Sequence, residues 1–415
     1  MKVAIIGAGI SGLSVAHFLK DRHEVTVFEK ESAPGGLIKC RRIDGSLFHT
    51  CGGHVFNSKR KDVLDWFWSQ FVREKEFSKA ERNSVVLMSD GTTIPYPIEN
   101  HMYLFDKDIQ KKFIEDLVIM AQNQNVEPTN FEDFLKARFG NTLYEMYFRP
   151  YNEKVWRREL KHVPISWLEG KLPMPTIAEM IYSNINHVKE KEFVHSTFWY
   201  ENNDGSQYIA NKLSEGLHIV YNTEIERIKV LKSSGVEILG ELFDIVVFCG
   251  NIKDFVTMLY GVDVSKFKDE IEKLKYHGTT AVFCEIDKNP YSWIYQPDKK
   301  HESHRIICTG NFAETNNSTK LQENRITATI EFTDYLPYPD IIDNLSRIPF
   351  HPTYLDHQYN QCTYPIQDSN TRNMIQSLKS YMASYGLYFT GRFADWEYYN
   401  MDVAIGAAMD LCRAI

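Results

Sequence analysis

Three glycines near the N-terminus have the spacing that dinucleotide binding requires. Gly7, Gly9 and Gly12 form a Gly-x-Gly-x-x-Gly motif directly after the apolar run 3–6, and residues 13–19 carry helical apolar spacing. Glycines at such a turn let the backbone approach a pyrophosphate, and the start of a helix presents free N–H groups to the phosphates. The succession of strand, turn and helix therefore predicts a dinucleotide-binding unit rather than an ordinary glycine-rich turn.

Glu29 and a second pair of glycines complete this unit. Glu29 ends the β-prone run 25–28, at a position where an acid accepts hydrogen bonds from ribose hydroxyls. Gly35 and Gly36 follow in a Glu-(x)5-Gly-Gly pattern, which lets a loop pass close to a flat ligand. This arrangement resembles the FAD-binding start of the amine oxidase and UDP-galactopyranose mutase superfamily. The resemblance implies FAD rather than NAD as the cofactor.

The loop at residues 49–58 carries a second motif. Gly53-His54-Val55-Phe56 resembles the Gly-x-His-Ile-Phe-His loop of the UDP-galactopyranose mutase family, FAD enzymes that interconvert the pyranose and furanose forms of nucleotide-sugars. In that family the loop lies beside the flavin ring, and Asn57 stands where the family has a second histidine. A loop histidine ordinarily bonds to backbone, but the glycines beside His54 permit its approach to a flavin edge.

Aromatic and cationic residues further along suit a nucleotide-sugar. The segment from Tyr151 to Trp156 is close to the family's Tyr-Thr-x-Lys-x-Trp, whose aromatics receive the substrate, and Lys171-Leu172-Pro173 resembles its Arg-Leu-Pro. A base stacks on aromatic faces and a diphosphate binds fixed cations, for which Lys171, Arg305 and Arg392 are candidates. Without the family match, two aromatics at this spacing would predict helix packing instead.

A third matching segment lies near the C-terminus. Gly391-Arg392-Phe393, and then the run from Tyr398 to Gly406, are similar to the family's Gly-Arg-Leu followed by Tyr-x-Asp-Met-Asp-x-x-Ile-Gly, with the distance from arginine to tyrosine retained. The resemblance implies catalytic roles for His54, Arg392 and Tyr398. It implies substrate binding by Tyr151, Trp156, Lys171 and Arg305. It implies cofactor binding by Gly7, Gly9, Ser11, Gly12, Glu29, Lys30, Gly35, Gly36, Leu37, His54, Ile225, Gly391, Arg392, Met401 and Asp402.

Three departures from the family pattern bear on the substrate. His277 stands where the family has a phosphate-binding arginine, Cys308 ends a segment that ends in glutamate in the family, and Asn400 replaces an aspartate. A related mutase that acts on another nucleotide-sugar fits these changes better than the galactose enzyme itself.

Bulk composition narrows the class of protein. The chain of 415 residues exceeds one ordinary core, so two or three domains are expected. A formal charge of -8 and dispersed lysines and arginines argue against nucleic-acid binding. Seven scattered cysteines without a CxxC spacing indicate reduced thiols in the cytoplasm, with no metal site. No apolar stretch is long enough for a membrane span, and the immediate N-terminal strand leaves no room for a signal peptide.

The patterning along the chain predicts an α/β protein with discontinuous domains. We expect a Rossmann-type FAD-binding domain from residues 1–90, 202–255 and 360–415. A helical domain is inserted at 100–190, and an antiparallel β-sheet domain comes from 191–201 and 270–359. Within this scheme Asp90-Gly91 predicts a hairpin between runs 84–88 and 92–94, and residues 403–411 predict a C-terminal helix.

The resemblance implies a redox-neutral mutase active with reduced FAD, in which flavin N5 forms an adduct with the sugar, in cell-surface polysaccharide biosynthesis. An FAD oxidase of the amine oxidase type is the alternative, because it shares the opening motif but not the second and third segments. A non-catalytic flavin protein is a third hypothesis. The sequence also allows a homodimer.

Overall fold

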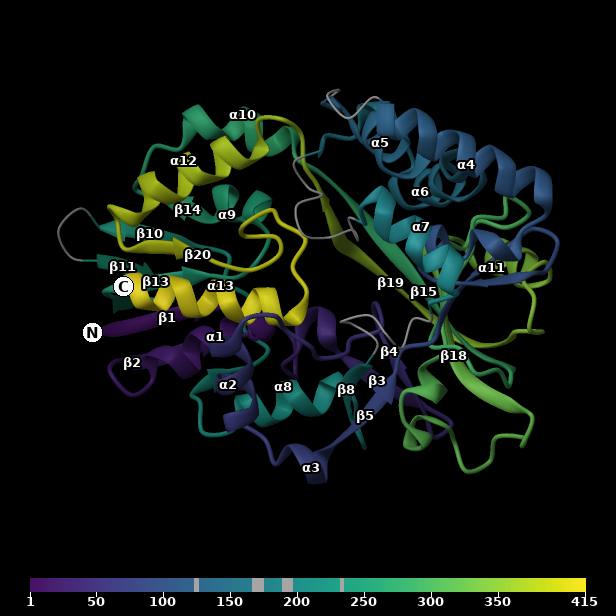
Figure 1. Cartoon of the computed structure of the whole chain (residues 1–415). Helices are drawn as coiled ribbons and strands as arrows, with labels where there is room; N and C mark the ends of the chain where they lie inside the picture. The colour runs from purple at the N-terminus through teal and green to yellow at the C-terminus, as the bar shows by residue number, and fades with distance from the viewer. Residues whose placement is uncertain (123–126, 166–174, 189–196, 232–234) are drawn as a thin grey trace.

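The computed structural model describes residues 1–415 except 123–126, 166–174, 189–196 and 232–234. Figure 1 shows two regions side by side: a parallel sheet with helices on both faces, and a long antiparallel sheet covered at one end by helices. The N- and C-termini lie next to each other in the first region. Lys2, at the start of the chain, therefore shares a region with the last helix, as the predicted discontinuous domain requires.

The parallel sheet is of the Rossmann type. It consists, in spatial order, of β20 (Leu387–Phe389), β13 (Ile245–Phe248), β1 (Lys2–Ile6), β2 (Glu24–Phe28) and β9 (Ile219–Val220). All four pairings are parallel. Numbered by position along the chain and read from β9, the strands run 3-2-1-4-5, the order in which a dinucleotide binds beyond the carboxyl ends near the first strand. The predicted fold class is confirmed.

Apolar side chains fill both faces of this sheet. One face carries α1 (Ile10–Leu19), α2 (Lys61–Ser69), α8 (Ser206–Ser214) and α13 (Met401–Ala414). The other carries α9 (Ile252–Met258), α10 (Ser265–Lys273), α12 (Thr371–Ala383) and a small sheet of β12 (Glu241–Phe243), β11 (Gly235–Ile238), β10 (Ile228–Leu231) and β14 (Leu259–Tyr260). The predicted C-terminal helix is confirmed, and it contacts α1 directly.

The antiparallel sheet has seven strands. Their spatial order is β19 (Thr353–Ile366), β15 (Lys275–Asp287), β18 (Arg325–Thr333), β17 (Arg305–Ile307), β16 (Trp293–Tyr295), β6 (Ser84–Leu87) and β7 (Thr93–Pro95). The hairpin predicted around Asp90-Gly91 is confirmed as β6 and β7. It differs from the expected division in joining this sheet, because β6 pairs in parallel with β16. At the other edge β19 continues to Ile366, past the expected boundary at 359.

Helices follow β7 within the segment 100–190, where the sequence predicts a helical domain. They comprise α4 (Lys107–Gln122), α5 (Phe131–Leu143), a π-helical turn (Tyr144–Phe148), α6 (Arg149–Trp156) and α7 (Ile177–Asn186). Their shared core includes Phe113, Leu117, Phe139 and Trp156. In Figure 1 these helices lie over one end of β15 and β19, so α6 is placed beside the long sheet.

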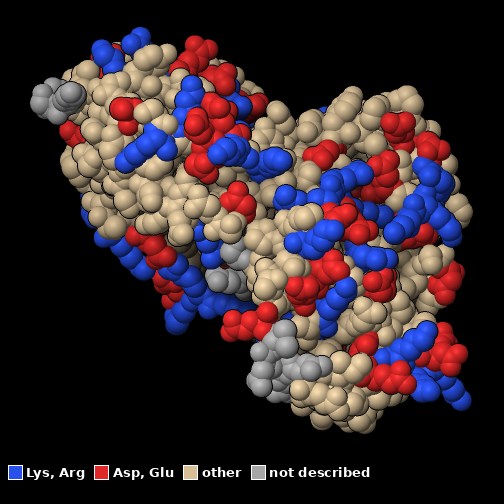
Figure 2. Space-filling model, turned by 90° about the horizontal axis from the view of Figure 1, so that it is seen from above, with Lys and Arg blue, Asp and Glu red and all other residues tan. Residues whose placement is uncertain are grey.

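Short elements connect these bodies. They are β3 (Cys40–Ile43), β4 (Ser46–His49), α3 (Arg73–Glu76), β5 (Phe77–Glu81), β8 (Thr197–Glu201) and α11 (Tyr338–Leu345). The strand β8 pairs with β5 and not with the seven-stranded sheet to which its residues were assigned from the sequence. Acidic and basic side chains are interspersed over the face in Figure 2. No helix among the described residues is long and apolar enough to cross a membrane.

Candidate cofactor and substrate site

The turn after β1 has the geometry of a phosphate-binding site. Gly7 has a φ of 104°, and a Cβ at Gly12 would lie 1.9 Å from the carbonyl oxygen of Gly7. Only a glycine allows this approach of α1 to the strand. Gly9 is the N-cap of α1 and supplies no side-chain acceptor to the first turn. The first N–H groups of α1 therefore suit an anion such as a pyrophosphate.

Glu29 and the two glycine pairs lie together at the carboxyl end of the sheet. The Glu29 carboxylate is buried and accepts hydrogen bonds from Ala8 N at 2.6 Å and Glu31 N at 2.9 Å. Gly9 and Gly35 form an isolated bridge, and a Cβ at Gly36 would lie 3.3 Å from the Gly9 Cα. These contacts keep side chains away from the surface in front of α1.

The C-terminal segment returns to the same place. Gly391 follows β20 with a φ of 119°, and a Cβ there would lie 3.1 Å from Ser11 Oγ on α1. Beside it, Thr390 Oγ1 is buried and has no hydrogen-bond partner among the described residues. A helix start without a side-chain cap, a turn lined by glycines and the buried Thr390 hydroxyl all fit a large polar cofactor at this edge of the sheet.

The remaining predicted cofactor residues are dispersed around this edge. Met401 and Asp402 begin α13, and Ile225 is buried in the core beneath the sheet. Lys30 is exposed. The Leu37 carbonyl oxygen lies 2.9 Å from His54 Nε2, which ties the His54 loop to the Gly36 turn.

The charge of Arg392 acts on the partly buried imidazole of His54. Burial, and then the positive charge of Arg392, lower the pKa of the His54 imidazole to about 4. The Arg392 guanidinium donates to the carbonyl oxygens of Tyr399 and Thr363, the latter at 3.1 Å. It also lies over the Tyr398 ring, 4.6 Å from the centroid. At neutral pH His54 is therefore an uncharged group beside a fixed cation.

The tyrosine rings of residues 364 and 398 connect Arg392 to Arg305. Tyr398 stacks on Tyr364 with ring centroids 5.4 Å apart and an interplanar angle of 4°. Arg305 Nη2 donates to the Tyr364 hydroxyl at 3.1 Å. All four side chains are partly exposed, so they line a surface that a ligand can reach.

Tyr151 joins this surface from α6. Its ring meets Tyr295 edge-on at 5.6 Å and stacks on Tyr147 at 5.5 Å. Burial raises the pKa of the Tyr151 hydroxyl, and the charge of Arg305 opposes this shift. Trp156 is buried in the core of the helical domain. Of the two predicted aromatics, Tyr151 is thus the one on the reachable surface.

Glu331 is a site residue that the sequence did not suggest. It is fully buried, accepts from Gly52 N at 2.7 Å, and pairs with Arg305, its cross-strand neighbour. Burial alone would raise the pKa of the carboxyl, but Arg305 and His304 hold the pKa well below its ordinary value. Its only signal in the sequence is a charge inside an otherwise apolar β-prone run.

His277, which replaces the family's arginine, has an internal role. Its Nδ1 lies 2.8 Å from Asp334 Oδ2 and its Nε2 lies 2.8 Å from the Trp156 carbonyl oxygen. The other replaced residue, Asn400, is the N-cap of α13 and makes no side-chain cap hydrogen bond. Lys171 lies outside the described residues.

The histidine, cysteine and acidic side chains bear on two further kinds of site, clustered metal ligands and reactive thiols. The described residues hold no group of three or more His, Cys, Asp or Glu side chains that could bind a metal ion. All seven cysteines are free thiols. Burial raises the pKa of the Cys51 thiol, which lies near Arg305 and Arg392, to about 12.

Comparison with known proteins shows what this chain is similar to. Residues 5–71 match the NAD(P)-binding Rossmann-like domain. A dTDP-fucopyranose mutase of Escherichia coli is 22% identical over 99% of this chain and 97% of its own length. A probable UDP-galactopyranose mutase of Klebsiella pneumoniae is 23% identical over 98% of this chain and 92% of its own length. The chain is therefore similar to these two mutases along nearly its whole length.

Solved structures give the same likeness of fold. A reduced UDP-galactopyranose mutase matches with a TM-score of 0.86 and 20% identity over 99% of this chain and 93% of its own. A putative protoporphyrinogen oxidase from Exiguobacterium matches with a TM-score of 0.76 and 14% identity over all of this chain and 98% of its own. Among curated relatives, a coproporphyrinogen III oxidase of Staphylococcus aureus matches only 36% of this chain. The predicted resemblance to the mutase family is confirmed.

Proposed function

We propose that the protein is an FAD-dependent mutase that interconverts the pyranose and furanose forms of a nucleotide-sugar. The observation that carries this proposal is the likeness to two curated mutases along nearly the entire chain. The oxidase alternative draws on curated relatives that match about a third of the chain. Fold alone would not choose between these functions, because both occur on it.

The residues at the carboxyl end of the sheet have a role in this proposal. The start of α1 holds the cofactor's pyrophosphate, Glu29 accepts from a ribose hydroxyl, and the Gly391 turn bounds the space for the ring system. Reduced flavin, when bound, supplies a nucleophile for the anomeric carbon of the sugar. His54 is uncharged at neutral pH, so it contacts the ring edge without adding a positive charge.

The aromatic and cationic residues hold the substrate. The rings of Tyr151 and Tyr295 contact the base. The guanidinium groups of Arg305 and Arg392 bind the diphosphate. Each guanidinium also has a protein partner, which fixes its plane before substrate arrives. Lys171 remains a candidate substrate contact. With His277 bound internally, a nucleotide-sugar other than UDP-galactose is the favoured substrate.

The cofactor and the redox balance test this proposal. We expect the purified protein to carry FAD, released on denaturation and identified by chromatography, and to take up no oxygen during turnover. Steady oxygen uptake with peroxide formation on an amine would establish the oxidase alternative instead.

The seven free thiols favour the reducing cytoplasm as the place where the protein acts. The furanose product would serve as a sugar donor in polysaccharide synthesis.

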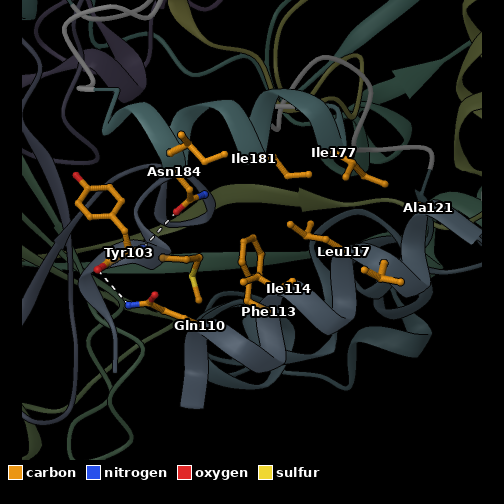
Figure 3. A pocket seen from close by; sticks show the side chains of 12 residues that line it. Tyr103, Gln110, Phe113, Ile114, Leu117, Ala121, Ile177, Ile181 and Asn184 are labelled. Atoms are coloured by element: carbon orange, nitrogen blue, oxygen red, sulfur yellow. Dashed lines mark hydrogen bonds between the residues drawn. The ribbon is translucent and has the colours of Figure 1, made fainter. Parts of the chain in front are cut away.

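We further propose a homodimer formed through the helical domain. An apolar groove of about 470 Å³ lies between α4 and α7. In Figure 3 the side chains of the two helices face each other across it. Its walls include Ile114, Leu117 and Val118 on α4 and Ile177, Ile181 and Ile185 on α7. Ile114 is 58% exposed and Ile185 is 72% exposed, more than scattered surface residues explain.

A second copy of the chain fits this groove. The four-residue spacing on both helices gives two apolar stripes, and a two-fold axis would pack them as four helices. Two adjacent helices, about 20 Å wide and up to about 24 Å long, offer several hundred Å², the order that one partner of a stable dimer buries. The Lys111–Glu115 pair on α4 places both charge signs beside the stripe.

Light scattering tests the dimer. We expect a dimer for the wild type and a monomer for the double variant Ile114→Glu, Ile185→Glu. Ile119→Glu is the matched control, because Ile119 is 55% exposed on α4 but does not line the groove. A monomeric wild type, or a control variant that dissociates equally, would contradict this surface.

A further inference from the structure

Lys154 lies on α6 and its ammonium group fastens that helix to a loop of the antiparallel sheet. Nζ donates to the carbonyl oxygens of Gln296 at 2.9 Å, Ser303 at 2.9 Å, and Asp298. Three acceptors use all three N–H donors of the protonated lysine, although burial lowers the pKa of the Lys154 ammonium to about 7. The side chain is partly buried, so water competes little for these bonds.

The loop that Lys154 binds joins two site residues. It leaves β16 after Tyr295 and enters β17 at Arg305. Tyr295 meets Tyr151 edge-on, and Arg305 interacts electrostatically with the same tyrosine. The Lys154 ammonium group therefore holds α6, which carries Tyr151, in a fixed position relative to the loop between β16 and β17.

Other contacts between α6 and this loop are weaker: Lys299 Nζ lies 4.0 Å from Glu153 Oε2, and the rings of Tyr151 and His304 meet edge-on at 6.4 Å. Arg157, one turn beyond Lys154, donates to Glu302 of the same loop at 2.9 Å, but both of these side chains are substantially exposed. An exposed ion pair contributes little because water and salt screen it. The three carbonyl bonds are charge-assisted and better shielded.

We propose that Lys154 is a positioning residue that holds Tyr151 in register with Tyr295 and Arg305, and so sets the affinity of the site for the nucleotide part of the substrate. This role rests on the proposed function. Lys154 touches neither substrate nor cofactor: it acts through the carbonyl oxygens of the loop.

A second lysine provides a matched control. Lys253 on α9 donates to the carbonyl oxygens of Ile271 at 3.1 Å, Glu272 at 2.7 Å and Leu274 at 2.7 Å. It is also partly buried. It makes the same kind of three-carbonyl contact in the sheet region that carries α9 and α10, with no residue of the substrate surface among its partners.

The test compares Lys154→Ala with Lys253→Ala by calorimetry with UDP and with dTDP, alongside FAD content and thermal unfolding. We expect Lys154→Ala to keep its FAD and to bind the nucleotide about ten- to a hundredfold more weakly, because a displaced binding group forfeits most of its contact. Lys253→Ala should lose a comparable amount of thermal stability and bind the nucleotide like the wild type.

Chemical rescue separates positioning from general stability. Propylammonium restores three N–H donors in the space vacated in Lys154→Ala, so it should recover much of the lost affinity. It should not rescue Lys154→Met, whose side chain fills that space. Tetramethylammonium, which has no donors, should rescue neither variant.

The outcomes are distinguishable. A wild type that binds neither nucleotide would overturn the proposed function. Nucleotide affinity of Lys154→Ala equal to that of Lys253→Ala would overturn the role of Lys154 alone. Loss of FAD or of folding in both Lys154 variants, without recovery by propylammonium, would make the lysine a general stabiliser and would also overturn it.

Discussion

Tyr364 and Tyr398 lie parallel, with ring centroids 5.4 Å apart, between the two arginines of the candidate site. Arg305 donates to the hydroxyl of the first ring, and Arg392 lies over the face of the second. The residues come from the antiparallel sheet and from the segment after β20. This stack therefore joins the two regions of the molecule where substrate and cofactor would meet.

Gly12 and Gly9 should fail in different ways when substituted. In Gly12→Ala the added carbon would lie 1.9 Å from the Gly7 carbonyl oxygen, so α1 must move and thermal stability should fall. A Cβ at Gly9 meets nothing closer than the Gly36 Cα at 3.9 Å. Gly9→Val should therefore fold but lose FAD, because its side chain occupies the approach to the pyrophosphate. Thermal unfolding of the apoproteins and flavin absorbance separate the two effects.

Arg392→Ala should weaken nucleotide-sugar turnover by about ten- to a hundredfold, since a charge-assisted hydrogen bond contributes roughly 1.5 to 3 kcal/mol. The change also frees the carbonyl oxygens of Thr363 and Tyr399 and removes the cation from the Tyr398 face. Arg392→Lys should recover only part of the loss, because a lysine cannot bridge both carbonyls in one plane. Unchanged turnover and nucleotide affinity in Arg392→Ala would make Arg305 the leading diphosphate partner.

Glu331→Gln should destabilise the protein by roughly 3 kcal/mol, the lower end for a broken buried ion pair, because it leaves Arg305, whose side chain is 18% exposed, without its counter-charge. The native pKa of Glu331 is depressed, so its contribution is present above the unfolded value of about 4.3 and is lost as the pH falls below it. Urea unfolding between pH 7 and pH 3 measures both effects. The wild type should lose stability more steeply than the variant in the acid range; parallel curves would contradict the assignment.

His54 should act in a different pH window. The native pKa of His54, about 4, lies below the ordinary histidine value near 6.5. Between these two pH values His54 is protonated in the unfolded chain but not in the native protein. Stability should therefore fall as the pH drops from about 6.5 towards 4, and His54→Gln should remove this part of the slope.

The local features of the fold were predictable, and the pairings across the molecule were not. Gly7 to Glu29 form one continuous unit, so their spacing alone determines the turn, and the Asp90-Gly91 hairpin is equally local. Where that hairpin docks depends on β16, some 200 residues away, whose partner preference no motif encodes.

The same reason separates the predicted from the missed site residues. Arg392 comes next to a glycine just after the end of a parallel strand. Residues at such positions contact the ligand, because ligands bind beyond the carboxyl ends of parallel strands. Glu331 meets Arg305 only through the register of β17 and β18, and Tyr364 meets Arg305 only because β19 lies in the same sheet. Such partners become visible only once strand order and register are known.

The central claim is redox-neutral ring isomerisation of a nucleotide-sugar. The most direct measurement is incubation of the dithionite-reduced protein with UDP-galactopyranose and with dTDP-fucopyranose, followed by chromatography of the products. We expect at least one of them to convert to a second isomer of equal mass, to the same final ratio from either direction, with no net use of reductant. Failure of both sugars to isomerise, together with reductant consumed or peroxide formed in proportion to product, would contradict the account.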